Sequence, residues 1–372
     1  MSIFQINCAS RMPSEGVAEL ASSTVGPTLL ESYQQHLALK TESTRTGLRH
    51  LGYGELFQGI TPCHLVRGFR GRADFAIRWH DNDCQVSGVS PSAGREAPLG
   101  ETLWALPRDI RARVVRLAEL LLANGAAWPV EGFEIRLAYG SDKFHVLLSV
   151  MRTSTASYGS FAERLMREIE GVSGVAIPSK KIEIGETFLQ HNLQGHSICA
   201  HYAAFFQNNF QLLGELVAYM KEQFCQNHQR VLDLYCGVGL HSLLVAAPKT
   251  DVLGADFNRA AIESARRNAC SAQMTRARYV CQTVERFVEE QELERPDLII
   301  ANPPRPGMGT AVISRAAEMK AGRIAVVSCC PKTHFDDLRT WKQRGYVATR
   351  IAAFDMFPFT SFLETVTTLE RG

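Results

Sequence analysis

From about residue 211 onward, the sequence alternates short apolar runs with helical stretches, and this alternation constrains the fold more than any other feature. The runs expected to form strands cover residues 230–235, 251–256, 278–281, 297–301 and 323–328, and a final strand pair covers about 346–354 and 363–369. Strands separated by helices predict an α/β fold with a parallel, doubly wound sheet. Ligands of such sheets bind at the carboxyl ends of the strands, where each motif described below falls.

The sequence before residue 211 has a different pattern, which indicates an α+β region. The expected elements are a helix over 32–51, a hairpin over 73–79 and 84–89, helices over 107–124 and 160–169, and strands over about 131–138 and 143–151. Residues 1–30 show no clear period. A length of 372 residues suits two domains better than one. We therefore expect an N-terminal α+β domain over 1–195 and an α/β domain over 196–372.

Composition narrows the classes of partner and cellular location. The formal net charge is only +2, so any attraction to nucleic acid must come from a local basic face. No apolar stretch approaches the ~20 residues of a membrane span, and the first residues lack the pattern of a signal peptide. The ten cysteines include no Cys-x-x-Cys pair, which argues against a zinc or iron–sulfur site. Scattered free thiols in a chain without an export signal predict a reducing cytoplasm.

The segment from Asp233 to Gly239 (DLYCGVG) follows an expected strand and opens a helix. Its glycines allow a tight turn and a close backbone approach to a ligand that the helix N-terminus faces. The next strand ends in Asp256, a carboxylate that can accept both ribose hydroxyls of a nucleoside. The alternatives are a structural turn with Asp256 as a helix N-cap, or a dinucleotide site whose third glycine is replaced. Together the loop and the acid favour a nucleoside cofactor.

A second motif, residues 302–307 (NPPRPG), ends the expected strand at 297–301. Its prolines make the backbone rigid and remove amide donors, which fixes the Asn302 side chain and the neighbouring carbonyls at the sheet edge. Enzymes that methylate exocyclic amines have an aromatic residue after the two prolines, where it stacks on a flipped base. Arg305 occupies that place here, which favours another acceptor atom and leaves the guanidinium available to a phosphate or a base edge. A proline-rich turn without a functional role is the alternative.

Cys329 ends the expected strand at 323–328, and Glu364 lies in a segment expected beside it. A cysteine attacks as its thiolate. Addition to C6 of a uracil would turn C5 into an enolate carbon that accepts a methyl group from S-adenosylmethionine. A base must then remove the C5 proton, and Glu364 is the candidate. Taken singly, a buried cysteine is more often structural and a glutamate near the C-terminus is more often solvated.

Together these residues resemble the S-adenosylmethionine-dependent RNA uracil-5-methyltransferases, which act on tRNA and 23S rRNA. The similarity covers roughly residues 200–372, and its motifs are specific as a set. The matching segments are 205–209 (FFQNN), 233–239, 302–307, 328–333 (SCCPKT) and 357–364. A weaker similarity to the tRNA branch involves Tyr33, Leu37, Lys40 and the segment 69–75 (FRGRADF).

The resemblance implies a Rossmann-like class I methyltransferase domain with an N-terminal α+β RNA-binding domain. It implies that Cys329 is the nucleophile and Glu364 the base. The residues implied to bind S-adenosylmethionine are Gln207, Asp233, Tyr235, Gly237, Gly239, Leu240, Asp256 and Asn302. The residues implied to meet RNA are Arg70, Arg72, Phe133 and Arg305.

A local basic cluster supports RNA binding in the N-terminal part. It consists of Arg67, Arg70, Arg72 and Arg78, interleaved with Phe69, Phe75 and Trp79. Such a cluster suits contact with phosphates and stacking on unpaired bases. The alternative is a solvated strand face whose aromatic side chains point inward.

Several positions depart from the pattern of this family. Cys330 stands where members usually have Asn, Phe362 where a His is common, Asn302 where Asp is more common, and Thr283 where an acid is often found near the adenine. The cysteine cluster that holds an iron–sulfur centre in some rRNA enzymes has no counterpart, and neither has an added β-barrel domain.

The sequence therefore predicts a cytoplasmic, monomeric enzyme that makes 5-methyluridine in RNA, without a metal, an iron–sulfur cluster or a membrane partner. The tRNA T-loop uridine is favoured over a uridine of 23S rRNA. Two competing interpretations remain. One is methylation of another atom, such as a base nitrogen. The other is an RNA-binding homologue that has lost activity, which Cys330 and Phe362 keep open.

Overall fold

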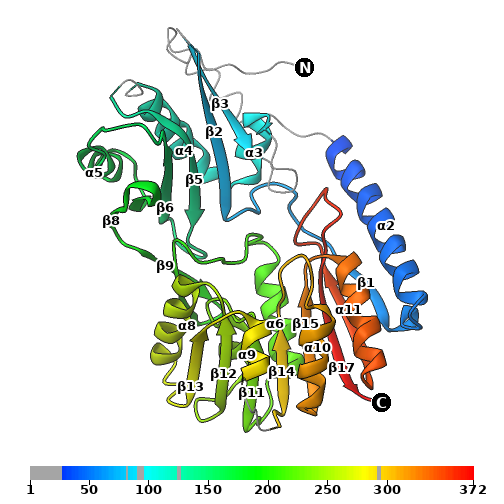
Figure 1. Cartoon of the computed structure of the whole chain (residues 1–372). Coiled ribbons are helices and arrows are strands. Elements are labelled where there is room, and N and C mark those ends of the chain that lie inside the picture. Colours follow the sequence, from blue (N-terminus) through cyan, green and yellow to red (C-terminus); the bar gives the residue numbers. More distant parts are fainter. Residues whose placement is uncertain (1–26, 81–82, 90–95, 124–126, 291–294) are drawn as a thin grey trace. The chain divides into compact units, whose positions relative to one another are not determined.

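The computed structural model describes residues 27–80, 83–89, 96–123, 127–290 and 295–372. The chain divides into two compact units (Figure 1). Unit 1 contains residues 65–196 together with 1–26, of which the latter lie outside the described residues. Unit 2 is formed by Pro27–His64 and Ser197–Gly372. The expectation for residues 1–30 therefore falls almost entirely outside the described chain, and the first described helix begins at Pro27.

Unit 2 has, in its described part, an eight-stranded sheet with the strand order β1-β16-β17-β15-β14-β11-β12-β13 (Figure 1). The strands are β1 (Phe57–Thr61), β11 (Arg230–Leu234), β12 (Asp251–Asp256), β13 (Ala277–Cys281), β14 (Leu298–Ala301), β15 (Arg323–Ser328), β16 (Tyr346–Phe354) and β17 (Glu364–Arg371). Strands β11 to β15 are parallel, whereas β17 runs antiparallel to both β15 and β16. The prediction of a doubly wound α/β sheet is confirmed.

Helices cover both faces of this sheet, which explains why its central strands are mostly apolar. The helices are α6 (Leu213–Phe224), α7 (Leu240–Val245), α8 (Arg259–Ser271), α9 (Val284–Glu290), α10 (Gly309–Glu318) and α11 (Pro331–Gln343). Helices α9, α10 and α11 pack side by side, and α6, α7 and α8 form a second group. All four residues of β14 are buried, as expected for a strand between two helical layers.

The segment Pro27–His64 belongs to unit 2, although the predicted boundary assigned it to the N-terminal domain. It forms helix α2 (Pro27–Arg49), the short helix η1 (Gly54–Leu56) and β1, which pairs in parallel with β16. Leu48, Leu51 and Phe57 are buried in the core of unit 2. The predicted domain boundary was wrong for this segment, because apolar periodicity identifies a helix without identifying the surface on which it packs.

Unit 1 contains a seven-stranded sheet within its described residues, in the order β4-β3-β2-β5-β6-β7-β8. Its strands are β2 (Arg72–His80), β3 (Asp83–Val89), β4 (Glu96–Ala97), β5 (Val130–Leu137), β6 (Phe144–Val150), β7 (Val172–Ile177) and β8 (Ile182–Gly185), followed by β9 (Phe188–Leu193). Its helices are α3 (Leu99–Ala105), α4 (Arg108–Ala123), α5 (Gly159–Glu168) and η2 (Pro178–Lys180). Strand β10 (His196–His201) spans the boundary between the units. The predicted α+β character and the β2–β3 hairpin are confirmed.

None of the helices in the described ranges is both long enough and apolar enough to cross a membrane. Within the same ranges, His, Cys, Asp and Glu side chains do not gather in groups of three or more that could hold a metal ion.

Candidate active site

A cavity of about 370 Å³ opens at the carboxyl ends of the central strands of unit 2. Its walls come from the chain segments that follow β11, β12, β14 and β15, and from the segment that leads into β17. The predicted site residues that line it are Gln207, Tyr235, Gly237, Leu240, Asp256, Asn302, Arg305, Cys329 and Glu364. The topology of a parallel sheet explains this convergence, because its strands end at one common edge.

Cys329 and Glu364 are brought together by the antiparallel pairing of β15 with β17. Ser328 is opposite Thr365 in this pair, so Cys329 and Glu364 occupy the next pair of positions. Two hydrogen bonds fix this register: the Leu363 amide donates to the Cys329 carbonyl at 3.1 Å, and the Thr365 hydroxyl donates to the Ser328 carbonyl at 3.1 Å. A thiol and a carboxyl group therefore line one cavity from neighbouring strands.

Burial sets the protonation of both groups. Glu364 is 2% exposed, and burial raises the pKa of its carboxyl group to about 7. Burial also raises the pKa of the Cys329 thiol to about 12, with a further increase from the Glu364 charge. The Arg305 guanidinium acts in the opposite direction and lowers the pKa of this thiol. The pair thus combines a neutral thiol with a carboxyl group that exchanges its proton near neutral pH.

Arg305 is held near the cavity by two contacts. Its Cζ atom lies 3.9 Å from the centroid of the Phe362 ring, a cation–π arrangement. Its carbonyl accepts a hydrogen bond of 2.8 Å from the Thr333 hydroxyl. Phe362, where the family commonly has His, therefore supports the guanidinium that favours the thiolate of Cys329.

The loop after β11 adopts the tight turn that its sequence predicts. Gly237 and Gly239 have φ of +53° and +77°. A Cβ atom added to Gly239 would lie 3.1 Å from the Tyr279 hydroxyl, whereas one added to Gly237 would meet open space. Tyr235 also has a positive φ, of +59°, which is strained for a residue with a large side chain. Three residues of this loop therefore have a left-handed backbone, and two of them, Tyr235 and Gly237, line the cavity.

Asp256 ties this loop to the end of β12. Its Oδ2 accepts a hydrogen bond of 3.0 Å from the Gly237 amide, and its Oδ1 accepts one of 2.8 Å from the Asn258 amide. Asn258 is the N-cap of α8, since its side chain accepts from the Ala260 and Ala261 amides. The alternative interpretation of Asp256 as the helix cap is therefore wrong.

Asp233 and Gly239 support the cavity without lining it. Asp233 is fully buried, and its Oδ2 accepts a hydrogen bond of 3.3 Å from the Ser242 amide. Burial raises the pKa of the Asp233 carboxyl group to about 7. Asn302, which does line the cavity, lies 3.3 Å from Nε2 of the buried His241.

The residues predicted to meet RNA in the N-terminal part have mixed surroundings. Phe133 is 2% exposed and stacks on Phe75 at 4.6 Å in the core of unit 1, so its prediction as an RNA contact was wrong. Arg72 pairs with Glu134 at 2.9 Å and with Asp74 at 3.4 Å. Burial lowers the pKa of Arg70. Phe75 and Phe69 are buried, which favours the alternative of a strand face with inward aromatic side chains.

The structure adds residues to which the sequence argument gave no role. Phe205 and Phe257 line the cavity although they are 60% and 71% exposed, and Phe357 and His241 line it as well. Usable signals existed for Phe205 and Phe357, which lie in the family-like segments 205–209 and 357–364, and for Phe257, which directly follows Asp256. By residue type alone, these aromatic residues are indistinguishable from core residues.

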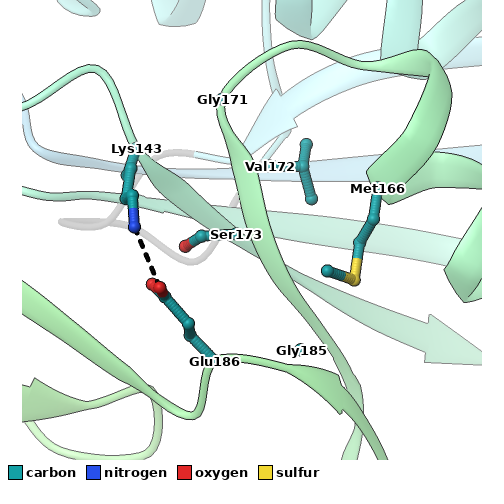
Figure 2. Close-up of a pocket in the computed structure, with 7 residues that line it drawn as sticks. All are labelled: Lys143, Met166, Gly171, Val172, Ser173, Gly185 and Glu186. Atoms are coloured by element: carbon teal, nitrogen blue, oxygen red, sulfur yellow. Dashed lines mark hydrogen bonds and ion pairs between the residues drawn. The ribbon is translucent and has the colours of Figure 1, made fainter.

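A second cavity, of about 460 Å³, lies in unit 1 and contains none of the predicted site residues (Figure 2). Lys143 and Glu186 line it and form an ion pair of 2.9 Å. Its other lining residues are Met166, Gly171, Val172, Ser173 and Gly185. The ammonium and the carboxylate form one ion pair at the surface, with about half of each side chain exposed.

Comparison with known proteins identifies the family of this chain. The family model described as tRNA (Uracil-5-)-methyltransferase matches residues 160–372, more than half of the chain. The chain belongs to the tRNA (uracil-5-)-methyltransferase family. The match includes every residue that lines the cavity.

Curated proteins with similar sequences are named as RNA methyltransferases. A protein of Thermotoga maritima named as an uncharacterized RNA methyltransferase is 30% identical over 251 residues, covering 64% of this chain and 57% of the relative. A protein of Nitratidesulfovibrio vulgaris with the same name is 26% identical and covers 91% of this chain and 79% of the relative. For the first relatives the chain spans only about half of their length, with 57% for the Thermotoga protein and 41% for one of Clostridium tetani.

A solved structure shows that the fold is that of this family. The crystal structure of Pyrococcus abyssi tRNA (uracil-54, C5)-methyltransferase in complex with S-adenosyl-L-homocysteine matches with a TM-score of 0.67 and 22% identity. The match covers 90% of this chain and 83% of that one. The predicted Rossmann-like class I methyltransferase fold is confirmed.

Proposed function

We propose that this protein methylates C5 of a uridine in structured RNA, with S-adenosylmethionine as the methyl donor and Cys329 as a covalent nucleophile. The proposal rests on one observation above all: Cys329 and Glu364 lie at adjoining ends of two antiparallel strands and line the same cavity. A thiol and a carboxyl group on opposite sides of a flat pyrimidine are the two groups that C5 methylation requires.

The cavity residues fit S-adenosylmethionine. The buried Tyr235 hydroxyl has no hydrogen-bond partner among the described residues, and Gly237 leaves open space where a side chain would stand. Asp256 would hold the ribose hydroxyls, since each of its oxygens has one further acceptor site. Phe257, Gln207, Leu240 and Asn302 would complete the contact. When bound, S-adenosylmethionine supplies an electrophilic methyl group.

Cys329 would act first. After loss of its proton to water, the thiolate adds to C6 of the uracil, and the electron pair of the C5–C6 double bond moves toward C5 and O4. The raised pKa of the thiol means that its surroundings must change before attack, and the Arg305 guanidinium is the group in the cavity that lowers this pKa. Arg305 would therefore favour adduct formation as well as contact the RNA.

Glu364 would act last. Once the electron pair at C5 has formed the bond to the methyl group, the Glu364 carboxylate takes the remaining C5 proton, the C5–C6 double bond forms again, and the sulfur of Cys329 leaves C6 as a thiolate. A base with a pKa of about 7 suits this task, because it is ionised at neutral pH yet binds a proton well. The sequence of steps involves no net oxidation or reduction.

The substrate that we propose is the T-loop uridine of tRNA, with a uridine of 23S rRNA as the alternative. The family description and the tRNA (uracil-54, C5)-methyltransferase with the same fold support tRNA. Attack at C6 requires a uridine that is turned out of its stack, which favours a loop. We propose that unit 1 contributes to RNA binding through Arg70 and Arg72, and that the protein acts as a monomer in the cytoplasm.

The test is methyl transfer from labelled S-adenosylmethionine to unmodified tRNA and to 23S rRNA fragments, followed by nucleoside analysis. Wild-type protein should yield 5-methyluridine in tRNA. Cys329→Ala should yield none, whereas Cys270→Ala, which changes an exposed cysteine on α8, should match the wild type. Glu364→Gln should accumulate a covalent RNA adduct, because the C5 proton stays in place.

Each other outcome has a defined meaning. Full activity of Cys329→Ala would refute the covalent mechanism, and a product methylated at nitrogen would favour the competing reaction. Failure of the protein to bind S-adenosylmethionine would favour an inactive RNA-binding homologue. Methylation of 23S rRNA fragments alone would replace tRNA as the substrate.

A further inference from the structure

Unit 2 contains a buried ion pair outside the walls of the cavity. Nζ of Lys40, on α2, lies 2.6 Å from Oδ1 of Asp355, which directly follows β16. Lys40 is 8% exposed and Asp355 is fully buried. The desolvation penalty for burying two charges can exceed the energy of their attraction. Stability alone therefore does not explain this ion pair.

The Lys40 ammonium also donates hydrogen bonds to two backbone carbonyls. They reach the carbonyls of Phe357 at 3.2 Å and Phe362 at 2.9 Å. Both carbonyls belong to the 355–363 loop, which connects β16 to Glu364 at the start of β17. An ammonium has three N–H donors, and all three donors of Lys40 bond to this loop: one to Asp355 and two to the carbonyls.

Tyr33 joins the same loop to a third segment. Its hydroxyl donates to Oδ2 of Asp355 at 2.9 Å and accepts a hydrogen bond of 2.7 Å from the Cys63 amide. The Asp355 amide donates to the Thr61 carbonyl, at the end of β1. We call Tyr33, Lys40 and Asp355 the loop anchor. It connects α2, the end of β1 and the loop through groups that are almost fully buried.

The loop needs such support because its backbone is strained. Phe359 has φ of +59°, a left-handed conformation that a bulky side chain rarely adopts. Its ring packs edge-on against Tyr33 with centroids 5.6 Å apart, and Nε2 of His36 lies 3.1 Å from the Thr360 carbonyl. Helix α2 therefore contacts the loop at successive points from Asp355 to Phe362.

Two ends of the loop belong to the active site. Phe357 lines the cavity, and the Phe362 ring supports Arg305. Beyond Phe362, the Leu363 amide bonds to the carbonyl of Cys329, and Glu364 follows. A shift of the Phe362 carbonyl would therefore move both the arginine and the base.

We infer that the loop anchor is a positioning device, in which Lys40 holds the 355–363 loop so that Glu364 reaches the proton at C5. This inference rests on the proposed function, since it assigns Lys40 a role through Glu364. Small displacements of a catalytic group are costly: a shift of about 1 Å lowers rates by roughly 100-fold.

The experiment compares Lys40→Met, Tyr33→Phe and wild-type protein in single-turnover methyl transfer to tRNA. Lys40→Met should slow the release of methylated RNA by roughly 10- to 100-fold and accumulate the covalent adduct, as Glu364→Gln does. Tyr33→Phe keeps the ion pair and should show the same defect more weakly. Arg49→Met removes an exposed cation of the same helix and should match the wild type.

Two readouts separate positioning from general loss of structure. S-adenosylmethionine affinity should be unchanged in Lys40→Met, and faster amide hydrogen exchange should be confined to residues 355–363. Slow turnover without adduct, or exchange that increases throughout unit 2, would overturn the inference. If Lys40→Met does not fold, the adduct and exchange readouts of Tyr33→Phe decide in the same way.

Failure of the proposed function gives a different result. In that case wild-type protein forms no adduct and no 5-methyluridine. Faster exchange confined to the loop would still support the anchor, whereas unchanged exchange in both variants would overturn it.

Discussion

Asp355 and Glu364 flank the same loop, and both carboxylates are buried, yet their surroundings differ. Asp355 meets the ammonium of Lys40 and the hydroxyl of Tyr33. For Glu364, burial is the one cause that shifts its pKa, which rises to about 7. A buried carboxylate with a fixed partner holds structure in place, whereas one without a partner exchanges its proton near neutral pH. The comparison separates a carboxylate that holds the loop from a carboxyl group that exchanges its proton near neutral pH.

The largest expected effect on stability comes from breaking the ion pair between Lys40 and Asp355. Lys40→Met leaves the Asp355 carboxylate buried without its cation, which should lower the free energy of unfolding by about 3–5 kcal/mol. Denaturant unfolding at pH 7 measures this. The exposed Arg49→Met variant is the control and should stay within about 0.5 kcal/mol of the wild type. An equally small change for Lys40→Met would remove the distinction between the two carboxylates.

Removing the charge of Glu364, which has no fixed cationic partner among the described residues, should raise the free energy of unfolding. The pKa of Glu364 rises from 4.5 to about 7 on folding, so stability is fully present below pH 4.5 and decreases as the pH rises through 7. Glu364→Gln avoids this loss and should stabilise the protein at pH 8 by on the order of 3 kcal/mol. At pH 4 the variant and the wild type should be equal in this respect. Unfolding curves at both values test the sign.

A smaller effect is expected from Tyr33→Phe. The variant keeps Lys40 and Asp355 together but removes the hydroxyl that donates to Asp355 and accepts from the Cys63 amide. Loss of a buried hydrogen-bonding group costs about 1–3 kcal/mol, so the stability loss should be clearly below that of Lys40→Met. The two variants, measured with the double variant, should be non-additive because they share Asp355.

The smallest effect is expected at Arg305. Removing its guanidinium should raise the pKa of Cys329 further, since Arg305 lowers that pKa. Arg305 is exposed and screened by solvent, so Arg305→Met should slow adduct formation only about three- to tenfold at pH 7.5. The deficit should stay constant between pH 7 and 9, because the pKa of the thiol lies well above this range and the thiolate fractions of both proteins rise in parallel. Phe362→Leu is a matched variant that removes the ring under the guanidinium.

The sequence predicted the catalytic half of the molecule well because its signals are local. Strand ends in a parallel sheet converge, so Asp256, Asn302 and Cys329 could be placed together from the order of strands alone. The pairing of Glu364 with Cys329 followed from adjacent segments at the end of the sheet. Neighbouring apolar runs and turn residues were sufficient for these predictions.

The rest depended on contacts that are distant in the sequence. Lys40 and Asp355 are 315 positions apart, and no periodicity connects them. The pairing of β1 with β16 was missed for the same reason, and with it the membership of α2 in unit 2. Phe133 was assigned to RNA binding from the family resemblance, which does not tell whether the side chain points outward or into the core, where the structure places it.

Unit 2 is built from two separate stretches of the chain, Pro27–His64 and Ser197–Gly372, so its parts are synthesised at different times. Helix α2 leaves the ribosome well before Asp355, since 315 positions separate Lys40 from Asp355. At about 5–20 residues per second, roughly 15–60 s pass between translation of Lys40 and translation of its counter-ion. During that interval the nascent helix carries a lysine destined for the interior without the group that neutralises it. Docking of α2 onto the 355–363 loop must therefore wait until this loop has been synthesised and has left the ribosome, and the same holds for the final placement of Glu364.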